Sequence, residues 1–132
     1  MKNLLAAFFV LLFSAFALAS DSSAEEAALH WLGLIDNGQY SQSWNASAPR
    51  FQASLTSEDW VRALNGARKP FGELKSRKVK KAKKRSTLPG LPDGEYTVLT
   101  MKSSFENKKK ATETLTFVKI ENEWKAIGYF IK

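Results

Sequence analysis

The feature that most constrains the fold of this sequence is a series of three strand-like segments in its C-terminal part. The segments EYTVLTMKSSF, ATETLTFVKI and EWKAIGYFIK are rich in Thr, Val, Ile and aromatic residues, which favour β-strands. Glu121 and Asn122 predict a tight hairpin turn between the last two segments, and the polar residues 106–110 predict a loop between the first two. The segments therefore predict an antiparallel meander, with Glu73 to Arg85 as a fourth, leading strand.

The part of the chain before these strands has the periodicity of helices. Apolar residues recur at helical spacing over residues 24–35 and predict a first helix. A short second helix is expected from Tyr40, with its stop at Pro49, and a third is expected to start at Thr56 and to end near Pro70. Helices followed by strands predict an α+β fold in which the N-terminal helices pack on a curved antiparallel sheet of about four strands.

The first residues are typical of a secretory signal peptide. A basic start at Lys2 precedes an apolar stretch from Leu4 to Leu18, and a small-x-small triplet ends at Ala19. We expect cleavage after Ala19, which makes residues 1–19 the signal peptide and residues 20–132 a single α+β domain in the periplasm. The apolar stretch is shorter than the roughly 18 to 20 residues that a membrane-spanning helix needs, so no integral membrane segment is expected after cleavage. The alternative, an uncleaved membrane anchor, is disfavoured by the polar segment SDSSAEE that follows.

The composition excludes several classes of chemistry. The sequence has no cysteine, which rules out disulfides, thiol nucleophiles, cysteine-ligated zinc and lipoprotein acylation. His, Asp and Glu do not occur at metal-ligand spacing, and neither a nucleophile elbow nor a glycine-rich phosphate loop is present. The single histidine, His30, is expected at the surface of the first helix. We expect no metal and no cofactor, and the sequence favours a protein that is not an enzyme.

Positive charge is concentrated in the segment KSRKVKKAKKR, residues 75–85. The predicted mature chain has 19 basic and 13 acidic residues, and without this segment it has 11 basic and 13 acidic residues. Regular strand alternation places Lys78, Lys80 and Lys84 on one face. It places on the other face Lys75, Arg77, Lys81, Lys83 and Arg85.

The basic segment has two interpretations. In one it is a solvated edge strand, where lysines prevent aggregation and their stems cover apolar surface. In the other it contacts anionic components of the cell envelope, such as lipopolysaccharide or anionic lipid, with about 1 kcal/mol for each engaged basic group. Nucleic acid is not an expected partner, because the chain is expected outside the cytoplasm and no stacking aromatic motif adjoins the segment.

Several motifs carry a family resemblance. LPGLPDGEY at residues 88–96 is followed by Phe105, Glu113, Trp124 and the closing GYFIK, and AALHWLGLIDNGQYSQSW and WVRAL precede it. The chain resembles an uncharacterised family of small exported bacterial proteins, domain of unknown function 4019. The resemblance implies a periplasmic protein without an assigned activity, and the family has an arginine near Arg77 but no dense lysine run. Its most specific part is the turn formed by Pro89, Gly90, Pro92, Asp93 and Gly94.

The order of helices and curved sheet also resembles the nuclear-transport-factor-2-like, or cystatin-like, α+β superfold. Its members include enzymes, ligand carriers and dimerisation modules, so this resemblance assigns no function. It implies a pocket on the concave face of the sheet. A buried Glu113 with a raised pKa would serve there as a general base, whereas the alternatives are a solvated strand start or a pair with Arg77. The candidate pocket residues are Arg77, Tyr96, Glu113 and Tyr129.

The last predicted strand has apolar residues on both faces. Strand alternation places Trp124, Ala126 and Phe130 on one face of the sheet. The other face receives Ile127, Tyr129 and Ile131. The second face therefore needs a cover, from a curl of the sheet or from a partner subunit. The leading hypothesis is a non-enzymatic periplasmic binding or assembly module, a homodimer through its sheet, whose basic strand contacts anionic partners. The alternative is a small-ligand carrier or isomerase-like enzyme that uses the concave face.

Overall fold

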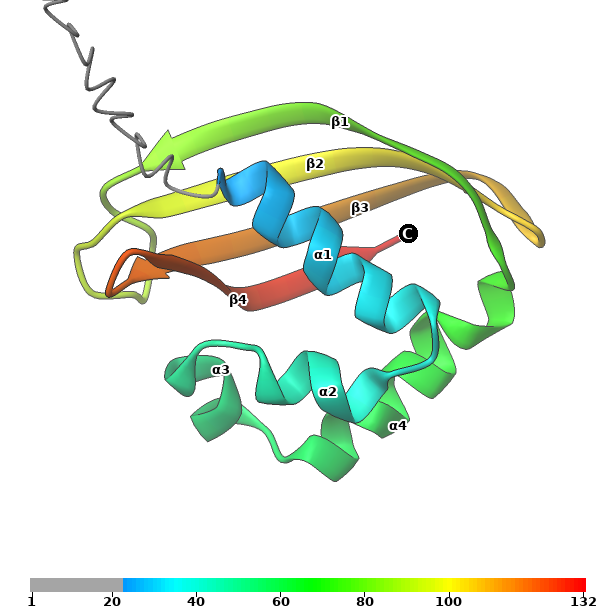
Figure 1. Ribbon diagram of the computed structural model, residues 1–132, viewed down its shortest axis with the longest axis horizontal. Coiled ribbons are helices and arrows are strands. Elements are labelled where there is room, and N and C mark those ends of the chain that lie inside the picture. Colours follow the sequence, from blue (N-terminus) through cyan, green and yellow to red (C-terminus); the bar gives the residue numbers. More distant parts are fainter. Residues whose placement is uncertain (1–22) are drawn as a thin grey trace, which may run out of the picture.

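The computed structural model describes residues 23–132, and these form helices followed by one antiparallel sheet (Figure 1). The sheet has the order β1-β2-β3-β4, so each strand pairs with the next along the chain. The predicted α+β fold is confirmed, and the predicted signal peptide lies outside the described residues. The helical elements are α1 (Ala24–Asp36), α2 (Tyr40–Asn45), α3 (Pro49–Ser54), α4 (Ser57–Ala67) and the 3-10 turn η1 (Lys69–Phe71). The strands are β1 (Leu74–Arg85), β2 (Tyr96–Phe105), β3 (Lys108–Ile120) and β4 (Glu123–Ile131).

Side-chain caps set the starts of the two longest helices. The Ser23 hydroxyl accepts a hydrogen bond from the Glu26 amide at 3.1 Å at the start of α1. The Thr56 hydroxyl accepts one from the Asp59 amide at 3.1 Å, so the predicted helix start at Thr56 is confirmed. The prediction for Pro49 is wrong. This proline begins α3, because a residue in the first helical turn needs no amide hydrogen for the helix.

The two hairpin connections are both short. Glu121 and Asn122 have positive φ angles of 50° and 67°, which is the geometry of a type I′ turn and confirms the predicted hairpin. The loop predicted at residues 106–110 is shorter than expected, because β3 already begins at Lys108. The lysines at 108–110 therefore belong to the sheet.

A bulge in β1 corrects the predicted alternation of the basic segment. The pairing of β1 with β2 shifts between Val79 and Lys81, and Lys80 is left without a cross-strand partner. Residues directly opposite each other share a face of the sheet, so the two sides can be read from the register. Lys78 and the residues Lys81, Lys83 and Arg85 lie on one face, opposite Lys102, Thr100, Val98 and Tyr96 respectively.

A second irregularity corrects the prediction for the last strand. The pairing of β3 with β4 shifts at Thr116 and Phe117, where Ile127 is the additional residue. As a result Trp124 and Ala126 share the helix-covered face with Tyr129 and Ile131. Phe130 lies on the opposite face and is 74% exposed.

The hydrophobic core lies between the helices and one face of the sheet. In Figure 1, α1 runs across the face of the sheet, and α2, α3 and α4 lie beyond the edge formed by β4. Trp31 of α1 donates a hydrogen bond to the Ser43 carbonyl at 2.9 Å, and Trp60 of α4 donates one to the Ser43 hydroxyl at 2.9 Å. The buried core includes Ala28, Trp31, Leu32, Ile35, Phe51, Trp60, Leu64, Leu99, Met101, Leu115, Phe117 and Ala126. Among residues 23–132, the helices therefore pack against one face of the sheet, and the second face stays open except at its β4 edge, where α3 borders a hollow with Thr116 and Gly128.

The cap at Thr56 generates the first prediction. Replacing Thr56 by Ala leaves the Asp59 amide without its side-chain acceptor, so we expect a loss of about 1 kcal/mol in the free energy of unfolding. Urea denaturation measures this loss. The control is Ser57→Ala at the first residue of α4, which should change the free energy of unfolding by no more than about 0.5 kcal/mol. Equal stability of the two variants would contradict a stabilising role of the Thr56 hydroxyl at the start of α4.

Candidate functional site

A cluster of charged side chains is buried between α1 and the sheet. Its centre is Arg77 on β1, whose Nε donates to Glu113 Oε1 at 2.7 Å and whose Nη2 donates to Oε2 at 3.1 Å. The same guanidinium donates from Nη1 to Asp36 Oδ2 at 2.7 Å and from Nη2 to Oδ1 at 3.0 Å. One arginine thus joins a carboxylate of β3 to a carboxylate at the end of α1. We call the set the buried ionic cluster: Asp36, Arg68, Arg77, Ser103, Glu113 and Tyr129.

Glu113 is fully buried, and both of its carboxylate oxygens are occupied. Oε1 accepts from the Ser103 hydroxyl as well as from Arg77. Oε2 accepts from the Tyr129 hydroxyl at 2.5 Å as well as from Arg77. Burial of a carboxylate is tolerated when it is paired and hydrogen-bonded in this way. The arrangement leaves no free face of the carboxylate for a substrate proton.

Arg68 completes the cluster from the helical side. Its Nη2 donates to Asp36 Oδ1 at 3.1 Å, and its Nη1 donates to the Gly72 carbonyl at 2.7 Å. The guanidinium carbon lies 4.1 Å from the centre of the Phe105 ring, a cation–π geometry. Asp36 is the last residue of α1, where the helix dipole disfavours a carboxylate, and the two arginines offset this cost.

The strand register brings the sheet members of the cluster together. Arg77 lies directly opposite Ser103, and Glu113 lies two residues from the partner of Ser103 and two from the partner of Tyr129. All four side chains therefore project from neighbouring strands toward α1. The alternation of side chains along β2 indicates that Ser103 also faces the helices, because it lies between the inward-facing Met101 and Phe105.

The electrostatics favour a fixed ion network. Burial alone would lower the pKa of Arg77, but hydrogen bonds to Asp36 and Glu113 raise it above its usual value. Burial raises the pKa of Tyr129 well above its usual value, and the charge of Glu113 and the hydrogen bond to it act in the same direction. Arg77 therefore stays charged and Tyr129 stays neutral across the physiological range.

The structure brings three of the four candidate pocket residues together. Arg77, Glu113 and Tyr129 are in the buried ionic cluster, whereas Tyr96 lies on the other face of the sheet. The Tyr96 hydroxyl donates to the Pro92 carbonyl at 2.5 Å beneath the proline-glycine loop. The sequence interpretation did not identify Asp36, Arg68 and Ser103 as members of the site.

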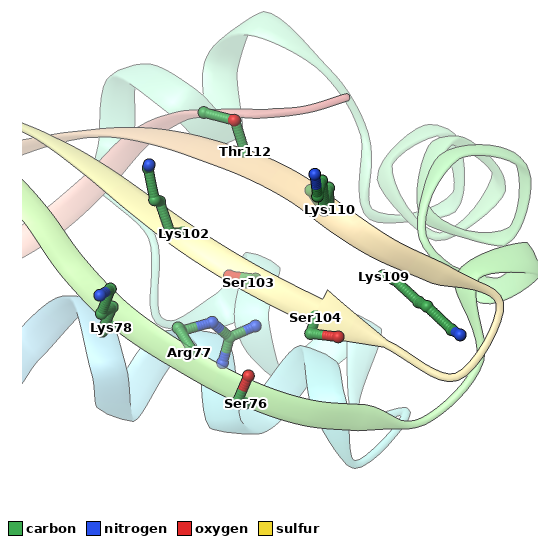
Figure 2. Close-up of a pocket in the computed structure, with 10 residues that line it drawn as sticks. Ser76, Arg77, Lys78, Lys102, Ser103, Ser104, Lys109, Lys110 and Thr112 are labelled. Atoms are coloured by element: carbon green, nitrogen blue, oxygen red, sulfur yellow. The ribbon is translucent and has the colours of Figure 1, made fainter.

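The helix-free face of the sheet carries most of the basic segment. Figure 2 shows Lys78, Lys102 and Lys110 on three neighbouring strands, β1, β2 and β3, with their side chains on one side of the sheet. Beyond the bulge, further cations on β1 continue this surface. We call it the basic face, made by the exposed side chains Lys78, Lys81, Lys83, Arg85, Lys102 and Lys110.

The other basic residues of the segment lie elsewhere. Lys75 is exposed and pairs with Glu73 at 3.3 Å, and Lys80 is the bulged residue. Lys84 lies opposite Thr97, which places it on the helix side of the sheet. Arg77 is in the buried ionic cluster.

A hollow of about 660 Å³ opens among the lysines of the basic face. Ser76, Ser104 and Thr112 add hydroxyl groups beside Lys78, Lys102, Lys109 and Lys110 (Figure 2). Arg77 and Ser103 also border it, although both side chains are turned toward the helices, where they bind Glu113. Ammonium and hydroxyl groups that converge in this way are donors for an anion, and a phosphate group accepts hydrogen bonds from both.

The proline-glycine loop closes one end of the helix-free face. The Gly90 carbonyl accepts a hydrogen bond from Arg50 of α3 at 3.3 Å, and the Gly94 amide donates to the Ser86 carbonyl at 3.0 Å. Gly90 has a φ of 76°, a left-handed conformation that glycine adopts without strain. The loop thereby spans from the end of the sheet to α3, and Pro89, Pro92, Asp93 and Gly94 belong to it.

Residues 27–129 match a protein family that is described as "Protein of unknown function (DUF4019)". The chain belongs to this family. The matched range begins in α1 and ends in β4, and it includes the whole buried ionic cluster and the basic face. No curated protein matches the sequence.

Between residues 23 and 132, His, Cys, Asp and Glu side chains do not gather in threes that would hold a metal ion. Over the same residues, the helices are too short and too polar to cross a membrane.

The ion network generates the second prediction. Replacing Arg77 by Met leaves the buried Glu113 without a cation and leaves Asp36 with Arg68 alone, so we expect the free energy of unfolding to fall by about 3 to 5 kcal/mol. The matched control is Lys78→Met, at the next residue of β1 on the exposed side, with an expected change within about 0.5 kcal/mol. Urea denaturation compares the two. Equal stability would show that the cluster does not hold the fold together.

Tyr129 generates a third prediction, about alkaline pH. Above about pH 10 the unfolded chain releases the tyrosine proton, whereas the folded chain keeps it because the pKa of Tyr129 is raised. The free energy of unfolding therefore decreases as the pH rises past this value. In Tyr129→Phe the decrease should be shallower, and denaturation curves at a series of pH values measure both slopes. Parallel slopes would contradict the burial of the neutral tyrosine.

Proposed function

We propose that this protein is a non-enzymatic binding module of the periplasm that contacts phosphate-bearing surfaces of the cell envelope through the basic face. The observation that carries the proposal is the gathering of cations from three neighbouring strands on the sheet face opposite to the one on which the described helices pack. The export that this requires rests on the first 19 residues of the sequence.

The basic face contains a repulsion that an anionic partner would relieve. Lys78 lies directly opposite Lys102, and like charges at directly opposite positions destabilise a sheet. Neither lysine is needed to cover the core, since both are exposed. A phosphate group between them turns this repulsion into two attractions.

The bulge at Lys80 increases the charge of this face. With regular alternation, Lys78 would lie on the opposite side from Lys81, Lys83 and Arg85, whereas the shifted register collects them on one side. At about 1 kcal/mol for each basic residue near an anionic membrane, four to six of them give about 4 to 6 kcal/mol. This corresponds to dissociation constants between about a millimolar and tens of micromolar.

The geometry of Glu113 counts against the alternative of an isomerase-like enzyme. A general base must reach the proton that it abstracts, yet this carboxylate is fully buried and both of its oxygens are already occupied. A homodimer through the basic face would bring like charges together, so we place the contact with an anionic surface there instead. The predicted self-association stays a prediction.

The fourth prediction concerns vesicles of phosphatidylglycerol and phosphatidylcholine. The processed protein should sediment with them at low salt and should dissociate as the salt concentration rises. The variant K78Q/K81Q/K83Q/R85Q should bind at least about tenfold more weakly, because it lacks four cations of the basic face. The control variant R62Q/K69Q/K84Q/K108Q loses the same charge away from this face, because Lys84 and Lys108 lie opposite the helix-side residues Thr97 and Phe105. It should bind as the unaltered protein does. Equal weakening of both variants, or no binding at low salt, would contradict the proposal.

A further inference from the structure

Two adjoining hollows on the helix-free face differ in chemistry. The first is the hollow between Lys78, Lys102 and Lys110. The second has a volume of about 370 Å³ and lies over β3 and β4, where Thr114, Thr116, Phe130 and Lys132 border it. Thr112 borders both. A ligand on this face therefore meets several ammonium groups at one end, and at the other end it meets hydroxyl and aromatic groups beside a single lysine.

The second hollow has a row of hydroxyl groups along one strand. Thr112, Thr114 and Thr116 are alternate residues of β3, so their side chains stand in line on the helix-free face. All three are half-buried, which holds their hydroxyl groups at the surface of the sheet. Hydroxyl groups both donate and accept hydrogen bonds, and in this they match the hydroxyl groups of a sugar.

An apolar platform stands beside this row. Phe130 lies directly opposite Thr114 and is 74% exposed, although a large apolar side chain is ordinarily buried. Next to it, Gly128 lies opposite Thr116 and leaves a space in which a Cβ atom would meet the Thr116 hydroxyl at 3.9 Å. Single exposed apolar side chains are common on protein surfaces, but Phe130 borders the hollow and gives it an apolar wall beside its polar groups.

We propose that the two hollows together bind a phosphorylated sugar, with the phosphate among the lysines and the sugar ring against Phe130 and the threonine row. A sugar ring combines an apolar C–H face with hydroxyl groups at its rim, which is the combination that Phe130 and the threonines present. This inference rests on the proposed function and deepens it. It names a phosphate-bearing glycan, rather than a glycerol phospholipid, as the preferred component of the envelope.

The test is a set of NMR titrations of the processed protein with glucose 1-phosphate, glycerol 3-phosphate and glucose. The two phosphate compounds carry the same anionic group, so the difference between them reports the sugar ring. Glucose 1-phosphate should shift the amide signals of Lys102, Thr114 and Gly128 and should bind at least about threefold more tightly than glycerol 3-phosphate. Glycerol 3-phosphate should shift the lysine hollow alone, and glucose should bind most weakly.

A pair of variants separates this inference from the proposed function. Phe130→Ala should remove the preference for glucose 1-phosphate and should leave the salt-dependent binding to vesicles unchanged. The control is Leu29→Ala, which removes another exposed apolar side chain, on α1, and it should keep the preference.

Equal affinities for the two phosphate compounds, or an unchanged preference in Phe130→Ala, would overturn the inference. Vesicle binding that persists in that case would leave the proposed function standing. The absence of both phosphate-induced shifts and vesicle binding would overturn the two together.

Discussion

The ion pairs of Arg77 are the interaction on which the arrangement of this domain depends. Hydrophobic contacts between helices and sheet are non-directional and permit some sliding of one layer on the other. The guanidinium removes this freedom, because it binds Glu113 through two nitrogens and reaches Asp36 of α1 with the same planar group. Planar, two-point contacts of this kind fix orientation as well as distance. They set the position of α1 relative to the sheet.

Two adjacent residues of β1, Arg77 and Lys78, lie on opposite faces of the sheet and have opposite electrostatic surroundings. Arg77 is buried, and its charge is neutralised by carboxylates, whereas Lys78 is exposed and lies opposite another lysine. The helix-covered face is electrically balanced, since two arginines meet two carboxylates there. The net positive charge of the domain is therefore presented on the side without helices.

The sequence predicted the order of helices and strands well, because that order follows from local patterns. The cap at Thr56 and the turn at Glu121 and Asn122 are contained in a few neighbouring residues, and both were found. The faces of β1 and β4 were assigned incorrectly, since a single unpaired residue, Lys80 or Ile127, inverts the alternation beyond it. A bulge depends on the pairing of two strands, and one strand alone does not reveal it.

The candidate site was predicted in part for the same reason. The fold resemblance suggested Glu113 and Tyr129 as pocket residues, with Arg77 as a possible partner of Glu113, and these three side chains do lie together. Asp36 was not identified, because its neighbours Asn37 and Gly38 are typical of a turn and nothing local shows that two arginines approach it from distant parts of the chain. Tyr96 was assigned to the same pocket, yet it lies on the other face of the sheet, where its hydroxyl donates to the Pro92 carbonyl of the loop.

The position of Glu113 late in the chain affects when folding can finish during synthesis. Asp36, Arg68 and Arg77 are made first, but Glu113 is supplied by the third strand. A growing chain that ends before β3 would have to bury Arg77 and Arg68 against a single carboxylate, which leaves an uncompensated cation in a dry interior. The nascent chain should therefore remain unfolded until its last third has emerged, and then close in one cooperative step.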